Sequence, residues 1–158
     1  MAKGEYVILA DHDDTIPPQA FYEVAKAINK HPDCDVLYSD EDKLDMDGKA
    51  LFDPHLKPDF NPDLLTSVNY ICHLFVVKKE LLDRVGGFRQ EFDGAQDYDL
   101  MLRAYAAGGQ FVHVPKVLYH WRCMKRLRRR TRRASATLTR RGSVRWKIIV
   151  FEKAGRRQ

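Results

Sequence analysis

Cysteine is scarce in this sequence, and long apolar runs are missing. The three cysteines, Cys34, Cys72 and Cys123, are odd in number, and no two of them have the C-x-x-C spacing. This argues against a disulfide framework and against a zinc site, and it favours a reducing compartment. No apolar run approaches the roughly 18 residues of a membrane span, and no signal peptide opens the chain. We therefore expect a cytoplasmic location.

Acidic residues are nearly missing from the end of the chain. Residues 122–158 hold 15 Lys and Arg but a single acid, Glu152, whereas residues 1–121 hold 12 Lys and Arg against 21 Asp and Glu. The net charge of +5 therefore averages an acidic body of −9 and a basic tail of +14. The 158 residues suffice for one domain with a hydrophobic core. We expect a domain over residues 1–122 and a basic tail over residues 123–158 that is partly disordered or adds one element.

A short apolar run near the start of the chain ends in a cluster of acids. Residues 6–10 are apolar without alternation, as in a strand that is buried on both faces. Asp11, Asp13 and Asp14 follow within four positions, and Pro17 then suits the first turn of a helix. The acids should lie at the carboxyl end of a parallel strand, where α/β sheets place their ligands. Three like charges so close together favour a divalent metal ion with oxygen ligands.

The same acids also admit a structural interpretation. Asp and Thr are common N-caps, and Asp14 or Thr15 would suit the helix that we expect over residues 17–30. The apolar strand directly before the cluster favours the metal site over the cap.

The rest of the sequence predicts alternating strands and helices. Residues 35–39 form a second buried strand that stops at Asp40, Glu41 and Asp42, which we interpret as a solvated turn. This order of strand, helix and strand is typical of a parallel unit. Phe88 should be buried after a glycine pair that ends a helix. The further elements expected are a hairpin turn at 45–48, an irregular loop over 52–62, helices starting at Asn61, Lys79 and Gly94, and strands over 72–77, 110–114 and 117–121.

Six short stretches occur in an order that is typical of one enzyme family. They are residues 8–14, 38–43, 69–73, 86–88, 94–103 and 113–122. With these stretches the sequence resembles the family 2 glycosyltransferases, and most of all the branch often labelled rhamnosyl- or O-antigen-type transferases. The resemblance implies the GT-A fold, an α/β protein with a Rossmann-like mixed sheet flanked by helices. It also implies transfer of a sugar from a nucleotide-sugar to an acceptor hydroxyl in cell-surface polysaccharide biosynthesis.

The resemblance gives roles to individual residues. Asp11 and Asp13 match the D-x-D pair that holds Mg or Mn against the donor diphosphate, and Asp14 adjoins them as a third metal ligand. Asp97 matches the general base that acts on the acceptor hydroxyl, which implies inversion at the anomeric carbon. His120 lies where related transferases place a late histidine beside the metal or the phosphate, although a lone histidine on an apolar strand is more often structural.

The sequence also departs from the family pattern. Members of the family begin with a further half Rossmann unit that grips the nucleoside, whereas this chain starts at the strand that leads to Asp11. It therefore resembles the C-terminal half of a catalytic domain, and we expect it to bind a nucleotide-sugar poorly by itself. After Arg122 an Arg-rich run replaces the loop that is usual in the family. Asp99 is interpreted as a first-turn acid of its helix.

The resemblance implies a UDP- or dTDP-sugar donor and a saccharide or lipid-linked saccharide acceptor. Alternatively, the protein is a non-catalytic binding module. Its basic residues 125–133 would then bind nucleic acid or the anionic cytoplasmic face of a membrane. Nucleic acid is disfavoured because the body is acidic and no aromatic residue interrupts the basic run before Trp146. A phosphatase or nuclease metal site would also use such carboxylates, but neither chemistry calls for an acid such as Asp97 at a helix start.

Overall fold

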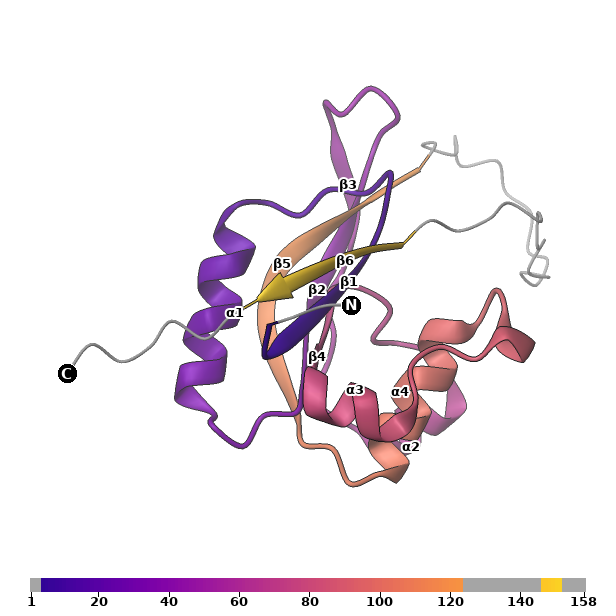
Figure 1. The fold of residues 1–158 in the computed structure, drawn as a ribbon. Helices are drawn as coiled ribbons and strands as arrows, with labels where there is room; N and C mark the ends of the chain where they lie inside the picture. Colours follow the sequence, from indigo (N-terminus) through magenta and orange to yellow (C-terminus); the bar gives the residue numbers. More distant parts are fainter. Residues whose placement is uncertain (1–3, 124–145, 152–158) are drawn as a thin grey trace.

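A mixed six-stranded sheet forms the centre of the molecule (Figure 1). The computed structural model describes residues 4–123 and 146–151. The strands are β1 (Tyr6–Asp11), β2 (Val36–Leu44), β3 (Leu51–His55), β4 (Phe75–Lys78), β5 (Phe111–Arg122) and β6 (Trp146–Phe151). They follow the order β3-β2-β4-β1-β6, and β5 also pairs with β2. The helices are α1 (Gln19–Lys30), α2 (Pro62–Ser67), α3 (Lys79–Val85) and α4 (Gln96–Ala106), with a short 3₁₀ turn η1 (Gln90–Phe92).

The helices lie on both faces of the sheet, and each face has its own hydrophobic cluster. On one face α1 packs through Val24 and Ile28. On the other face α2, α3 and α4 pack through Leu65, Leu81 and Leu100 (Figure 1). Because side chains alternate along a strand, β1 supplies residues to both clusters. The predicted α/β class, with a mixed sheet flanked by helices, is confirmed, and so is the burial of the first strand on both faces.

The neighbours of β1 are antiparallel to it. β1 pairs with β4 on one side and with β6 on the other. β2 also pairs antiparallel with β4, so β1 and β2 run in the same direction with β4 between them. The first two strands therefore have the parallel direction that the sequence predicts, although they are not direct neighbours in the sheet. The physical reason is that β4, whose Phe75, Val76 and Val77 are fully buried, takes the position between them.

The second strand is longer than the sequence predicts, since it continues through Asp40, Glu41 and Asp42. These three residues are only 5–8% exposed, so the solvated turn expected there is wrong. A basic partner on a neighbouring segment offsets the burial of each carboxylate. The partners are His113, Lys57 and His120, respectively.

The last described strand before residue 124 is continuous, although two strands are expected around Pro115. β5 pairs parallel with β2, and the register moves from the pair Ser39–Val114 to the pair Asp40–Val117. Pro115 therefore lies at an irregularity of the ladder. Bulges are among the few places where a sheet accommodates proline, because the residue there needs no ladder hydrogen bond.

The prediction of an ordered loop, without helix or strand, over residues 52–62 is wrong in its first part. Leu51–His55 form β3, which pairs with β2 at the edge of the sheet. Pro54 is tolerated there because an edge strand leaves part of its backbone unpaired. The hairpin turn expected before this strand is confirmed, since Gly48 has a φ of 72° and donates its N–H to the carbonyl of Asp45 at 3.0 Å.

Local signals for helix ends are confirmed at two helices. α2 begins after Asn61, whose side chain accepts a hydrogen bond of 2.9 Å from the N–H of Leu64. α3 ends at Gly86, which has a φ of 85°. Phe88, which we expected to be buried, is instead 39% exposed. Gly86 and Gly87 both have positive φ and lead the chain into a surface loop, which explains the difference.

The other expected elements differ at their ends. α1 begins at Gln19, α4 begins at Gln96 and β4 begins at Phe75, each two or three residues later than the sequence suggests. The basic run over residues 125–133 lies outside the described part of the chain. Of the helices that are described, none combines the length and the apolar character needed to cross a membrane.

Candidate metal centre and catalytic site

Three side chains that can bind a metal ion meet at the end of β1: Asp11, Asp14 and His73. One ligand atom from each lies within 4.8 Å of the other two. Nε2 of His73 is 3.9 Å from Oδ2 of Asp11. Oδ1 of Asp11 is buried and has no hydrogen-bond partner within the described residues. A buried carboxylate oxygen without a partner is unfavourable, and a cation would supply the missing partner.

The antiparallel pairing of β1 with β4 explains how His73 reaches Asp11. Leu9 pairs with Phe75, the first residue of β4, so the residues just before β4 lie beside the end of β1, where Nε2 of His73 approaches Oδ2 of Asp11. Asp14 approaches from the turn that follows β1. No role is predicted for His73 from the sequence, although His73 ends one of the six stretches that carry the resemblance, because the sequence does not show which strand it will face.

Asp14 is bound to β5 and does not cap a helix. The hydroxyl of Tyr119 donates a hydrogen bond of 2.5 Å to Oδ2 of Asp14, and the backbone N–H of Arg122 donates one of 2.8 Å to Oδ1. The Tyr119 hydroxyl also accepts a bond of 3.1 Å from the N–H of Asp11. No side-chain hydrogen bond caps α1. The interpretation of Asp14 or Thr15 as a helix cap is therefore wrong.

Burial raises the pKa of both carboxylic acids in this group. For Asp11, the charges of Asp14, Asp13 and Asp97 raise the pKa further, whereas His73 lowers it. Crowded carboxylates in a partly buried place favour either protonation or a bound cation. The contribution of Asp97 also means that its carboxylate lies within electrostatic range of Asp11.

Asp97 lies half-buried in the first turn of α4. The side-chain amide of Asn69 donates a hydrogen bond of 3.1 Å to Oδ2 of Asp97, while Oδ1 of Asp97 has no hydrogen bond within the described residues. The amide oxygen of Asn69 accepts a second bond, of 3.2 Å, from the N–H of Cys72. We call residues 69–73 the bridge segment, because it joins Asp97 to His73.

Two residues with roles implied by the resemblance are not part of the group of three. The side chain of Asp13 is 57% exposed, and its Oδ1 lies 3.7 Å from Nδ1 of the equally exposed His12. Nδ1 of His120 lies 2.5 Å from Oδ1 of Asp42 on β2. The role of Asp13 as a metal ligand and the role of His120 beside the metal or the phosphate stay predictions.

The sequence also does not predict that Tyr119 contacts the metal-binding group, although Tyr119 is next to His120 in the chain. Neighbouring side chains on a strand point to opposite faces. Tyr119 stacks on His73, with ring centroids 4.6 Å apart, and reaches Asp14, while His120 pairs with Asp42. Without the strand register, nothing distinguishes a phenol that supports a site from a phenol in the core.

Asp99 connects α4 to the end of α3. Its carboxylate accepts hydrogen bonds from Arg89 and from Arg103, the latter through Nε at 2.9 Å. The bond from Arg89 lowers the pKa of Asp99, and Arg103 adds to this effect. Arg103 also donates to the backbone carbonyls of Val85 and Gly87, each at 2.5 Å. These contacts give Asp99 a structural role.

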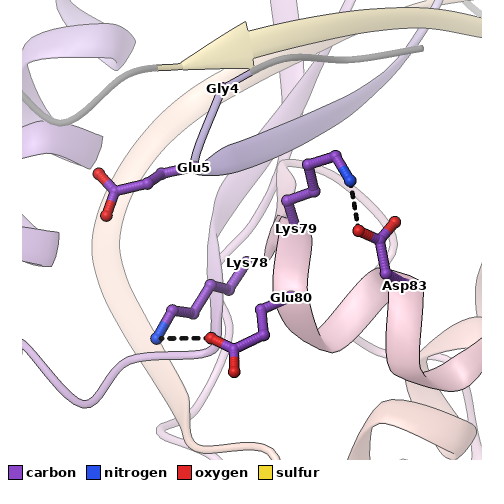
Figure 2. Close-up of a pocket in the computed structure, with 6 residues that line it drawn as sticks. All are labelled: Gly4, Glu5, Lys78, Lys79, Glu80 and Asp83. Carbon is purple, nitrogen blue, oxygen red and sulfur yellow. Dashed lines mark hydrogen bonds and ion pairs between the residues drawn. The ribbon is translucent and has the colours of Figure 1, made fainter.

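A pocket lies at the opposite end of β1 from Asp11 (Figure 2). Four of its charged side chains form two ion pairs: Lys78 lies 3.8 Å from Glu80, and Lys79 pairs with Asp83. The ion pairs neutralise four of these side chains, and Glu5 is the one lining carboxylate of the described residues that is outside them.

The sequence of the chain is similar to that of a known protein family. A family model described as "Glycosyltransferase like family 2" matches residues 1–147. The O-antigen biosynthesis protein RfbC of Myxococcus xanthus is 46% identical over 120 residues, which is 76% of this chain and 9% of that protein. The uncharacterized protein y4gI of Sinorhizobium fredii (strain NBRC 101917 / NGR234) is 47% identical over 124 residues, which is 77% of this chain and 14% of that protein.

More distant similarity extends to a named polysaccharide synthase. A chondroitin synthase of Pasteurella multocida (strain Pm70) is 26% identical over 119 residues, which is 75% of this chain and 12% of that protein. The chain therefore spans a small part of the length of each curated relative that it matches. The similarity therefore describes one segment of these proteins and does not extend to the activity of the whole protein.

Proposed function

The chain belongs to the glycosyltransferase-like family 2, and from that premise we propose that it transfers a sugar from a nucleotide-sugar donor to an acceptor hydroxyl. The observation that carries the proposal is the convergence of Asp11, Asp14 and His73 at the end of β1, with Asp97 joined to the segment that carries His73 by the hydrogen bond from Asn69. In this interpretation the described residues supply the metal-binding and acceptor-activating side of the enzyme.

The donor atoms of the group suit a divalent cation. Carboxylate oxygens are ligands that Mg²⁺ and Mn²⁺ prefer, and the imidazole of His73 favours Mn²⁺ as the better match. The buried and unpaired Oδ1 of Asp11 supports this fit. A bound cation would neutralise the negative charge that builds on the departing nucleoside diphosphate. Asp11, Asp14 and His73 would hold it, and Asp13 is proposed as a further ligand on the exposed side of the turn.

Asp97 is proposed as the general base. The bond from Asn69 occupies Oδ2 of Asp97 and leaves Oδ1 to accept the proton of the acceptor hydroxyl. The acceptor oxygen then forms a bond to the anomeric carbon, and the bond from that carbon to the diphosphate oxygen breaks. The electron pair leaves with the nucleoside diphosphate. A single displacement of this kind inverts the anomeric configuration.

The substrates are proposed from the family and from the names of the relatives. RfbC is named as an O-antigen biosynthesis protein, and another relative as a chondroitin synthase. We propose a UDP- or dTDP-sugar as donor and a saccharide, free or lipid-linked, as acceptor in cell-surface polysaccharide biosynthesis. His120, paired with Asp42, is proposed to lie near the donor phosphates.

Contact with an anionic membrane surface is a separate proposal. It rests on the basic composition of residues 125–133, at about 1 kcal/mol for each basic residue near the surface. It would place the protein at the cytoplasmic face of a membrane. Cosedimentation with anionic vesicles at two salt concentrations tests it, and binding that does not weaken with salt would contradict it.

The proposed function is tested in a chimera. The segment of this chain that aligns with RfbC replaces the corresponding segment of RfbC, and O-antigen synthesis is measured. We expect synthesis in the chimera and its loss when Asp97 is changed to Asn. The matched control is Asp33→Asn, because Asp33 is exposed and has no side-chain interaction in the described structure. An active chimera that tolerates Asp97→Asn would contradict the role of the base.

A further inference from the structure

The bridge segment is held in place by a buried ion pair between Lys57 and Glu41. We propose that these two residues are positioning residues, which hold the bridge segment so that His73 faces Asp11 and completes the metal centre. The inference rests on the proposed function, because it takes the group of three side chains as the place where the cation binds.

The ammonium of Lys57 is enclosed by the bridge segment. Its side chain is 0% exposed. Nζ donates hydrogen bonds to the backbone carbonyl of Ile71 at 2.5 Å, to the backbone carbonyl of His73, and to Oε2 of Glu41 at 3.2 Å. A lysine ammonium has three protons to donate, so these acceptors satisfy it completely.

Glu41 completes the contact from β2. Its Oε2 accepts a hydrogen bond of 3.0 Å from the backbone N–H of His73. The N–H and the carbonyl of His73 are therefore both bound to the same ion pair. The imidazole of His73 stacks on Tyr119, with ring centroids 4.6 Å apart, and this directs Nε2 toward Asp11. Backbone and ring of His73 are thus fixed by different partners.

The bridge segment needs such support. Cys72 has a φ of 43°, in the left-handed region that residues with a side chain rarely adopt. Conformations of this kind persist only where the surrounding structure holds them. The ion pair binds the carbonyls on both sides of Cys72, those of Ile71 and His73.

Stability alone does not explain the charges. A buried ion pair loses the hydration of both ions, so a well-packed apolar pair of the same volume is often as stable or more stable. What an apolar pair cannot do is bind backbone carbonyls and an N–H at defined angles. The atoms that Lys57 and Glu41 bind belong to the segment that carries His73 and, through Asn69, contacts Asp97. We therefore assign the pair to the geometry of the site.

The test replaces both charges together, with Lys57→Met and Glu41→Gln in one variant of the full chain. Removing only the lysine would leave a buried charge without its partner and would risk unfolding. The probe is Mn²⁺ alone, titrated by electron paramagnetic resonance. We expect cooperative unfolding of the double variant, which shows that it is folded. We also expect it to bind Mn²⁺ at least about tenfold more weakly, because the loss of a residue that orients a metal ligand typically lowers metal affinity by that much.

The chain offers a matched control. Lys78 and Glu80 form an ion pair of 3.8 Å that is partly exposed at the far end of β1 (Figure 2). The same two substitutions there, Lys78→Met and Glu80→Gln, remove equal charge from the protein. Mn²⁺ affinity should stay unchanged in this control, which separates local positioning from a general loss of charge.

A spectroscopic measurement reports on His73 itself. With Co²⁺ in place of Mn²⁺, an imidazole that coordinates the ion through Nε2 gives a paramagnetically shifted, exchangeable N–H resonance in the proton NMR spectrum. We expect this resonance in the wild type and in the control, and its loss in the double variant. A change that only lowered stability would leave the resonance in place. If the double variant does not fold, Glu41→Gln alone is measured in the same way, and unchanged affinity would then overturn the inference.

The outcomes separate this inference from the proposed function. Equal Mn²⁺ affinity and an unchanged Co²⁺ spectrum in the double variant would overturn the positioning role and leave the metal centre standing. If the wild type binds no metal, the proposed metal centre and this inference fail together, which is a different result from an unchanged affinity in the double variant.

Discussion

Tyr119 and Asp14 are 105 residues apart in the chain, yet the Tyr119 hydroxyl donates a hydrogen bond of 2.5 Å to Oδ2 of Asp14. The same hydroxyl accepts a bond of 3.1 Å from the N–H of Asp11. One phenol therefore links both ends of the acidic turn that follows β1. Burial, together with the bond to Asp14, raises the pKa of Tyr119 and keeps it a neutral donor.

Tyr119→Phe is expected to weaken Mn²⁺ binding and to lower the free energy of unfolding by about 1 kcal/mol, because two hydrogen bonds to the turn are lost. Metal titration and urea denaturation measure the two effects. Tyr22→Phe is the control, since Tyr22 is 65% exposed. Unchanged Mn²⁺ affinity in Tyr119→Phe would show that Asp14 needs no support from β5.

His73→Ala is expected to weaken Mn²⁺ binding by about tenfold or more, because the imidazole ligand is removed and the ion keeps only carboxylate ligands. The matched variant is His12→Ala, because the side chain of His12 is 57% exposed and lies beside Asp13. Calorimetry with Mn²⁺ compares the two. Equal losses in both variants would favour a metal site on the exposed side of the turn, around Asp13.

Asp99→Asn is expected to destabilise the fold by about 2 kcal/mol, since it removes the charge-assisted hydrogen bonds from Arg103, whose side chain is 18% exposed. The lowered pKa of Asp99 means that its ion pairs stabilise the protein above the unfolded-state pKa of about 3.9. This contribution is lost as the pH falls through the lower folded-state pKa. The midpoint temperature of thermal unfolding, measured between pH 3 and pH 7, should therefore depend less on pH in the variant, because the variant has one titrating carboxylate fewer.

Asp83→Asn provides the contrast for Asp99. Asp83 pairs with Lys79 one helical turn away, and its side chain is 62% exposed. Exposed pairs of this kind contribute about 0.5 kcal/mol or less. An effect as large as that of Asp99→Asn would contradict the structural role given to Asp99.

Gly86→Ala is expected to lower the free energy of unfolding by about 1 kcal/mol. Gly86 has a φ of 85°, and a Cβ placed there would meet no atom within 4 Å, so the effect comes from the backbone conformation alone. Asn tolerates the left-handed region better, so Gly86→Asn should be less destabilising. The reverse order in urea denaturation would contradict this explanation of how α3 ends.

Features set by a few adjacent residues could be predicted from the sequence. The burial of β1, the cap at Asn61 and the end of α3 at Gly86 follow from local composition and from glycine chemistry. The acidic turn after the first strand was also predicted as the candidate metal site. Each of these has a local signal, namely an apolar run, a capping residue, a glycine or a cluster of acids, which a single sequence can report.

Features set by distant partners could not be predicted. The acids of β2 look like a solvated turn until Lys57, His113 and His120 are placed beside them. Likewise, His73 becomes a candidate ligand only through the pairing of β4 with β1. Buried charges and strand neighbours depend on contacts across the sheet, and no local pattern in the sequence reports them.

The central claim is that Asp11, Asp14 and His73 bind a divalent cation next to Asp97. The most direct test is the broadening of backbone and side-chain NMR signals by Mn²⁺ added to the full chain. We predict saturable broadening that is strongest at the amides of Asp11, Asp14 and His73 and that extends to Asp97. Broadening centred instead on Glu80 and Asp83, at the far end of β1, would contradict the claim.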